Sequence, residues 1–166
     1  MRTLALSLIL MSAAALAQNT PGQKMPESGL VAGFTAPAGN AVDFPLAQLL
    51  AANKDMDAKQ MQSLRILEGG KYNINIRRLK EGERSLIHPS ITDIWVVTEG
   101  SGILVTGGEL VNGTKDARGE QTGTGIRGGT ERTIKAGDVI FIPPGVAHAV
   151  KETKQITYLN IRFDVK

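Results

Sequence analysis

Hydrophobic and polar positions alternate with a period of two through most of the second half of the chain. The alternation begins with Leu64 and Ile66, reaches a glycine pair at 69–70, and resumes with Ile74 and Ile76. This period is typical of strands with one buried face, and paired glycines suit a tight turn. The pattern predicts a β-hairpin. It leaves open whether the row of Tyr72 or the row of Asn73 faces inward.

Short β-branched or aromatic segments follow at regular spacing, separated by turns that contain glycine. They cover residues 94–97, 103–105, 139–142 and 156–163. Short strands without intervening helices favour an antiparallel sandwich or barrel. The glycines at 100 and 102 are expected to bracket a tight turn between two of these strands. The fold class predicted for this region is therefore all-β and antiparallel.

A long glycine-rich polar segment interrupts the strands at residues 112–129. Glycines let backbone amides approach anions, but no phosphate-binding loop motif occurs here and no helix follows. We expect a flexible hairpin tip.

The N-terminal third lacks the two-residue period. Leu46, Leu49 and Leu50 stand at helical spacing within residues 43–53, which predicts a short helix that buries these leucines against the core. Residues 18–42, rich in Pro, Gly, Asn and Ala, predict a flexible leader or a strap across a surface.

Residues 1–17 have the pattern of a secretory signal peptide. A basic Arg2 precedes an apolar run that is too short to span a bilayer, and Ala15 and Ala17 frame a small-residue cleavage site. The mature protein is therefore expected to be secreted or periplasmic.

Composition narrows the class of protein further. The chain has 166 residues, 42% of them hydrophobic, no cysteine and a net charge of +3. This excludes disulfide scaffolds, cysteine-based zinc sites and thiol nucleophiles, and it favours one globular domain, which we place at residues 43–166. The small charge excess lacks the basic patch expected of a nucleic-acid partner, and no membrane partner is expected.

The chain contains two histidines, His88 and His148. His148 ends the segment GDVIFIPPGVAH, which resembles the second cupin motif, G-x5-P-x-G-x2-H-x3-N. Gly137, Pro143 and Gly145 match at the motif's spacing together with His148, whereas the final position is a glutamate.

The segment EGERSLIHPSITDIWVVTEG resembles the first cupin motif, G-x5-H-x-H-x3,4-E-x6-G, less completely. In one register His88 is the second histidine, Asp93 takes the place of the glutamate, and Leu86 stands where the first histidine belongs. In the rival register His88 is the first histidine and Ser90 replaces the second. The first register is preferred because it keeps the family's spacing before Asp93.

The resemblance implies a small jelly-roll-like β-barrel and one divalent metal ion, Fe, Mn, Zn or Ni. Carried over residue by residue, the ligands are His88, Asp93 and His148. A set of two imidazoles and one carboxylate leaves positions open for substrate. The resemblance also implies a homodimer.

Strand parity adds two candidate pocket-lining residues. If Asp93 points into the barrel, Trp95 and Val97 share its face, where they either line the pocket or fill the core. Three functions stay open: a metal-dependent oxygenase, isomerase or lyase acting on a small polar or aromatic molecule; a pocket that binds a sugar, phenolic or organic acid without catalysis; or a structural or storage role.

The cleavage site generates a prediction about processing. Exported protein should begin at Gln18 and remain in the soluble fraction, because Ala15 and Ala17 suit the signal peptidase. Intact mass spectrometry of exported material measures this directly. A mass that includes residues 1–17, or stable recovery with membranes, would contradict it.

Overall fold

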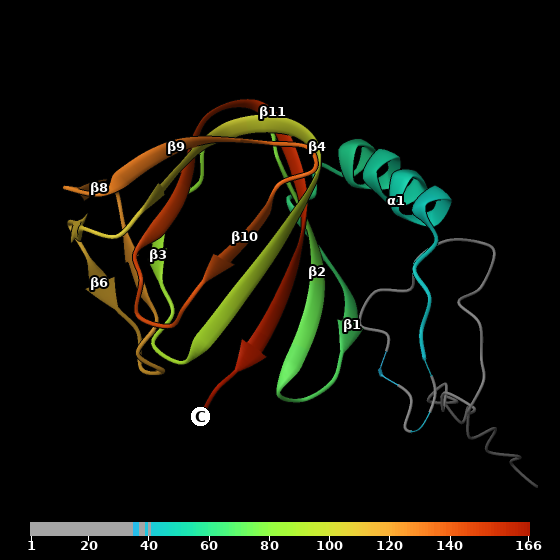
Figure 1. Ribbon diagram of the computed structural model, residues 1–166, viewed down its shortest axis with the longest axis horizontal. Helices are drawn as coiled ribbons and strands as arrows, with labels where there is room; N and C mark the ends of the chain where they lie inside the picture. The colour runs from blue at the N-terminus through green and yellow to red at the C-terminus, as the bar shows by residue number, and fades with distance from the viewer. Residues whose placement is uncertain (1–34, 37–38, 40) are drawn as a thin grey trace, which may run out of the picture.

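The computed structural model describes residues 35–36, 39 and 41–166, which form one helix and antiparallel strands (Figure 1). This confirms the predicted fold class, all-β and antiparallel with a short N-terminal helix. The elements are α1 (Leu46–Ala58), β1 (Ser63–Glu68), β2 (Tyr72–Leu79), β3 (Ser85–Ile87), β4 (Ile91–Thr106), β5 (Glu109–Val111), β6 (Thr114–Lys115), β7 (Gln121–Gly123), β8 (Gly125–Arg127), β9 (Thr130–Lys135), β10 (Val139–Ile142) and β11 (His148–Asp164).

Two long strands, β4 and β11, form the centre of the sheet. They pair antiparallel from Ile91 opposite Asp164 to Thr106 opposite His148. On its other side β11 pairs with β2 and β3, and β4 pairs with β9 and β10. Four of the other strands of the sheet therefore pair directly with β4 or β11.

The expected turn at Gly100 is absent, and residues 94–97 and 103–105 belong to the single strand β4. Gly100 instead lies opposite Ile156 within the ladder, with a positive φ of 71°. The β4–β11 register shifts between Lys151 and Gln155 and again between Thr157 and Tyr158. Such bulges bend strands, so the chain curves here rather than reversing.

The predicted hairpin forms between β1 and β2, with a register shift between Arg65 and Leu67. In β2, Ile76 packs beneath the helix, whereas Asn75 and Arg77 line a cavity on the opposite face of the sheet. The structure thus decides the question that the alternation left open. The polar row of β2 faces inward.

Helix α1 lies outside the sheet beside β1 and β2 (Figure 1). Its buried residues include Ala52 and Met56, which pack on Ile66 and Ile76 with Leu49 partly buried. Leu46 and Leu50 are 64% and 41% exposed. The expectation that they would be buried was wrong, because the helix continues to Ala58, five residues past the predicted range of 43–53, and docks through Ala52 and Met56 in its second half.

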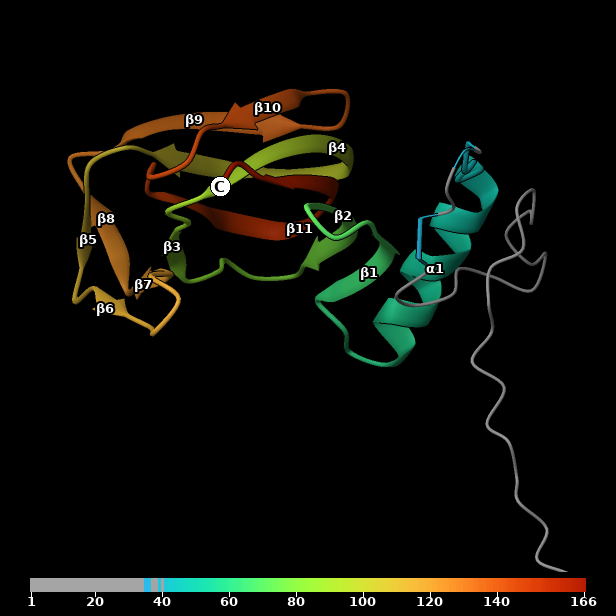
Figure 2. The same cartoon turned by 90° about the horizontal axis from the view of Figure 1, so that it is seen from below.

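The glycine-rich segment at 112–129 contains strands, which corrects its interpretation as only a hairpin tip. Within it β7 pairs with β6 and with β3, and β8 pairs with β5. Figure 2 places these short strands at the end of the molecule away from α1. The segment therefore covers one end of the sheet, where β3 leads into His88.

The signal peptide at 1–17 and most of the leader at 18–42 lie outside the described residues. Ala36 and Val42 pack on Leu67, and the Ala36 amide donates to the Glu68 carbonyl at 2.9 Å. None of the helices in the described part of the chain has the length and apolarity needed to cross a membrane. The domain boundary at residue 43 stays a prediction.

The bend of β4 generates a prediction about stability. A Cβ at Gly100 would lie 2.0 Å from the Gln155 carbonyl oxygen, and the residue has positive φ. We expect Gly100→Ala to lower the free energy of unfolding by about 3 kcal/mol or more, because the cost of backbone strain adds to the cost of displacing β11. Urea unfolding measures this.

Gly70→Ala is the matched control, because Gly70 also has positive φ, 77°, but its Cβ would meet nothing within 4 Å. It should lose about 1 kcal/mol. Equal losses in the two variants would show that close packing against Gln155 does not matter.

Candidate metal centre

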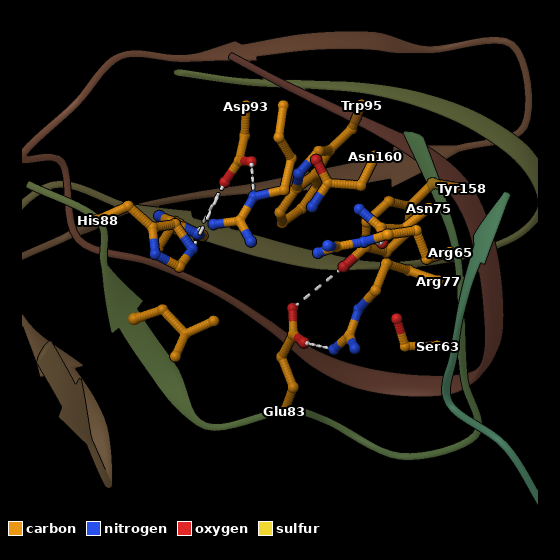
Figure 3. Close-up of a pocket in the computed structure, with 13 residues that line it drawn as sticks. Ser63, Arg65, Asn75, Arg77, Glu83, His88, Asp93, Trp95, Tyr158 and Asn160 are labelled. Carbon is orange, nitrogen blue, oxygen red and sulfur yellow. Dashed lines mark hydrogen bonds and ion pairs between the residues drawn. The ribbon is translucent and has the colours of Figure 1, made fainter. Parts of the chain in front are cut away.

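A cavity of about 180 Å³ lies against the inner face of the sheet (Figure 3). Its walls come from β1, β2, β3, β4 and β11 and from the segments that follow β2 and β3. They are mostly polar, with several guanidinium and carboxylate groups. The lining residues are Ser63, Arg65, Asn75, Arg77, Glu83, Leu86, His88, Asp93, Trp95, His148, Tyr158, Asn160 and Arg162.

The structure brings His88, Asp93 and His148 together at one end of this cavity. Asp93 Oδ2 lies 3.7 Å from His88 Nε2 and 3.6 Å from His148 Nε2. One donor atom from each residue lies within 4.8 Å of the other two. His88 follows β3, Asp93 lies near the start of β4, and His148 begins β11.

Each imidazole is held through its other nitrogen. His148 Nδ1 lies 2.9 Å from the Val146 carbonyl oxygen, and His88 Nδ1 contacts a carboxylate oxygen of Glu120. A carbonyl can only accept a hydrogen bond, so in neutral His148 Nδ1 carries the proton and Nε2 keeps its lone pair. The ionised Glu120 carboxylate selects the same tautomer in His88. This is the arrangement found around metal-bound histidines.

The distances fit a divalent ion. Separations of 3.6 and 3.7 Å between Asp93 Oδ2 and the Nε2 atoms are too long for good hydrogen bonds. With donor bonds of about 2.1 Å, two ligands of a tetrahedral ion lie about 3.4 Å apart. The nitrogen, nitrogen and oxygen donors therefore have the chemistry and nearly the spacing of a metal site.

Asp93 is the buried charge of the group, with 1% of its surface exposed. Its other oxygen, Oδ1, accepts a hydrogen bond from Arg162 Nε at 2.9 Å. A buried carboxylate needs such a partner to remain ionised. Because Arg162 binds Oδ1, Oδ2 of Asp93 faces the two histidines.

Burial lowers the pKa of His148, although the Val146 carbonyl and the Asp93 carboxylate act in the opposite direction. The neutral imidazole is therefore favoured in the folded protein. Neutral imidazole is the form that binds metals.

Trp95 lines the cavity, whereas Val97 does not. Val97 lies one pleat further along β4 and is packed in the hydrophobic core with Leu79 and Ile156, so its assignment as a pocket-lining residue is corrected. The indole of Trp95 stacks on Tyr158, with ring centroids 4.4 Å apart.

The position of Leu86 agrees with the preferred register of the first motif. Leu86 lies opposite His148 in the β3–β11 pairing and lines the cavity. Ser90 lines a separate surface hollow with Glu120 and Arg162. Ser90 therefore does not stand where a further ligand would be needed.

Sequence reasoning missed Glu120 and Arg162. The sequence could have indicated Arg162, because it forms a polar row with period two along β11, together with Tyr158 and Asn160. Glu120 has no such signal, since it lies in the glycine-rich segment and approaches His88 only through the pairing of β7 with β3. Local periodicity does not reveal a contact such as that between His88 and Glu120, which lie 32 residues apart in the sequence.

A second polar group lines the same cavity. Glu83 pairs with Arg77 and accepts a hydrogen bond from the Tyr158 hydroxyl at 3.2 Å (Figure 3). Burial raises the pKa of Tyr158 well above its ordinary value, and the Glu83 carboxylate adds to the shift. The Tyr158 hydroxyl is thus a fixed, neutral donor.

Comparisons with known proteins give structural matches only. No protein-family model matches the chain, and no curated protein matches it. The chain is similar to an uncharacterised conserved protein with a double-stranded β-helix domain from Klebsiella pneumoniae, at 18% identity over 62% of this chain and 76% of that chain, with a TM-score of 0.44.

Two further solved structures are similar at the same level. One is a predicted oxalate decarboxylase from Thermotoga maritima, at 19% identity over 61% of this chain and 78% of that one, with a TM-score of 0.44. The other is a cupin 2 conserved barrel domain protein from Salinispora arenicola, at 18% identity over 61% and 74%, with a TM-score of 0.42. These likenesses concern the fold. What the cavity binds follows from this chain's own residues.

The lowered pKa of His148 generates a prediction about stability and pH. Unfolded His148 takes up a proton near pH 6.5, whereas the folded residue does so only at lower pH. Between those values the unfolded chain binds more protons, so the free energy of unfolding should fall as pH drops below 6.5, by up to about 1.4 kcal/mol per pH unit. Urea unfolding of chelator-treated protein from pH 5 to 8 measures this.

His148→Gln is the control, because an amide does not titrate in this range. Its free energy of unfolding should depend less steeply on pH below 6.5 than that of the wild type. Identical slopes would mean that His148 keeps an ordinary pKa in the fold.

Proposed function

We propose that this protein is a metal-dependent enzyme of cupin type that acts on a small polar molecule in the barrel cavity. The observation that supports the proposal is the convergence of His88 Nε2, His148 Nε2 and Asp93 Oδ2, with both imidazoles fixed through Nδ1. Fixed donors lower the entropy lost when a metal binds.

The donor set suits Fe, Mn, Zn or Ni, and three protein ligands leave positions for substrate. A bound divalent ion supplies a Lewis acid that polarises an oxygen atom of the molecule beside it. The chain's own residues have other tasks. Arg162 balances the charge of Asp93, and Glu120 and Val146 orient the histidines.

A binding protein without catalysis is the second candidate. It is favoured by Leu86, an apolar side chain in the cavity wall at the position where the cupin motif has its first histidine. Metal-dependent turnover separates the two candidates, since a binding protein would take up ligand without converting it. Export and the homodimer stay predictions.

The proposal predicts metal affinity that depends on the histidines. Isothermal titration of the mature protein with Zn²⁺, Mn²⁺ and Fe²⁺ at pH 7.5 should show one site. His148→Ala and His88→Ala should abolish binding, because one imidazole and one carboxylate would remain. Glu120→Gln should weaken binding by about 10- to 100-fold, as losses of supporting hydrogen bonds do.

Ser90→Ala is the matched control and should bind as the wild type does, because Ser90 lies outside the cavity. In the wild type the affinity should also weaken below pH 6.5, where protons compete for the imidazoles. Unchanged affinity in His148→Ala would refute the metal site and the enzyme built on it.

A further inference from the structure

Two buried polar atoms in the cavity wall have no hydrogen-bond partner among the described residues. They are the indole donor Trp95 Nε1 and the amide acceptor Asn160 Oδ1. Trp95 is 1% exposed and Asn160 is 8% exposed. Buried polar groups in folded proteins are nearly always paired, so an orphaned donor and an orphaned acceptor in one cavity point to a ligand.

The two residues are direct neighbours. Asn160 lies opposite Trp95 in the β4–β11 ladder, and both line the cavity (Figure 3). One pleat away, Arg162 lies opposite Asp93 in the same ladder. Residues facing each other in this way share one side of the sheet. The orphaned pair therefore adjoins the candidate metal centre.

The direction of the Trp95 donor is fixed. Its ring stacks on Tyr158 and meets His148 edge-on, with centroids 5.7 Å apart. The indole cannot turn its N–H to another partner without losing both ring contacts. A hydroxyl group is complementary to this pair, because its oxygen accepts one hydrogen bond while its hydrogen is donated in another.

The cavity also offers a cationic group to a ligand. Its lining contains three arginines, and each pairs with a carboxylate: Arg65 with Glu68, Arg77 with Glu83 and Arg162 with Asp93. Arg162 uses Nε to bind Asp93, and in the described part of the chain its two Nη groups make no hydrogen bond or ion pair. A guanidinium with free Nη groups is a good binding group for a carboxylate.

We propose that the cavity binds a small hydroxycarboxylate, whose carboxylate meets Arg162 and whose hydroxyl is held between Trp95 Nε1 and Asn160 Oδ1. The inference rests on the proposed function in taking this cavity as the substrate site. A volume of about 180 Å³ has room for roughly six water-sized groups. The ligand class is therefore limited to acids about the size of lactate.

The test uses the mature protein and its single tryptophan, Trp95, as the reporter. L-lactate, D-lactate and propionate are titrated into zinc-loaded and chelator-treated protein, followed by tryptophan fluorescence and calorimetry. Propionate has the carboxylate without the hydroxyl. One lactate enantiomer should bind about tenfold more tightly than propionate, since a site built to hold a hydroxyl discriminates against its absence.

Substitutions in the cavity wall test which residues cause the preference for lactate over propionate. Asn160→Leu and Trp95→Phe should each lower lactate affinity about tenfold and leave propionate affinity unchanged, measured by calorimetry. Arg162→Met should weaken both acids alike, because both carry the carboxylate. Asn53→Leu is the matched control, since Asn53 is another buried asparagine with an unpartnered Oδ1, but lies in α1 away from the cavity. It should bind both acids as the wild type does.

The outcomes separate the inference from the proposed function. Lactate and propionate binding equally, or neither binding, would overturn the inference even if zinc binds. That result would mean that water satisfies Trp95 and Asn160. Failure to bind zinc would refute the proposed metal site instead. In that case a lactate preference in the chelator-treated protein would still support the inference, because Arg162, Trp95 and Asn160 do not require the ion.

Discussion

The curvature of the β4–β11 pair decides whether this protein has a site. His148 lies opposite Thr106, thirteen positions along β4 from Asp93. A straight strand would place these positions roughly 40 Å apart. Asp93 and His148 nevertheless approach within 3.6 Å, because both long strands bend where Gly100 meets Gln155 and the register shifts. The bend that curves the sheet thus also brings the candidate metal ligands together.

The inner face of the sheet is unusually polar for a buried surface, and pairing makes this tolerable. Arg162 offsets Asp93, and Arg77 with the Tyr158 hydroxyl offsets Glu83. Buried charges without such partners would cost several kcal/mol each. The helix side of the sheet needs no such compensation, because Ile66, Ile76 and Met56 fill it. The cavity side also contributes to the core, because Trp95 and Tyr158 line the cavity and belong to the same buried hydrophobic cluster as Val97.

The alternation of hydrophobic and polar residues predicted the strands well where one face of the strand is buried and the other is exposed. The hairpin and the strand segments at 94–97, 103–105, 139–142 and 156–163 all follow from it. The pattern was wrong at Gly100, because a glycine can form a turn but can also allow two strands to approach closely. Gly100 permits a bend against Gln155, and that use depends on a strand 55 residues later. Leu46 and Leu50 likewise had the right spacing for a helix, but the helix docks through Ala52 and Met56 in its second half.

The sequence by itself determined the all-β class, the hairpin and three candidate ligands, because alternation and motif spacing are local properties that short segments carry. Tertiary structure decided which row of β2 faces inward, that Glu120 holds His88, and that Arg162 holds Asp93. It also decided that Trp95 and Asn160 lie opposite each other in one ladder, and that Trp95 Nε1 and Asn160 Oδ1 have no hydrogen-bond partner in the described part of the chain. These facts depend on sheet curvature and strand pairing between distant segments, and periodicity within a segment contains no information about either.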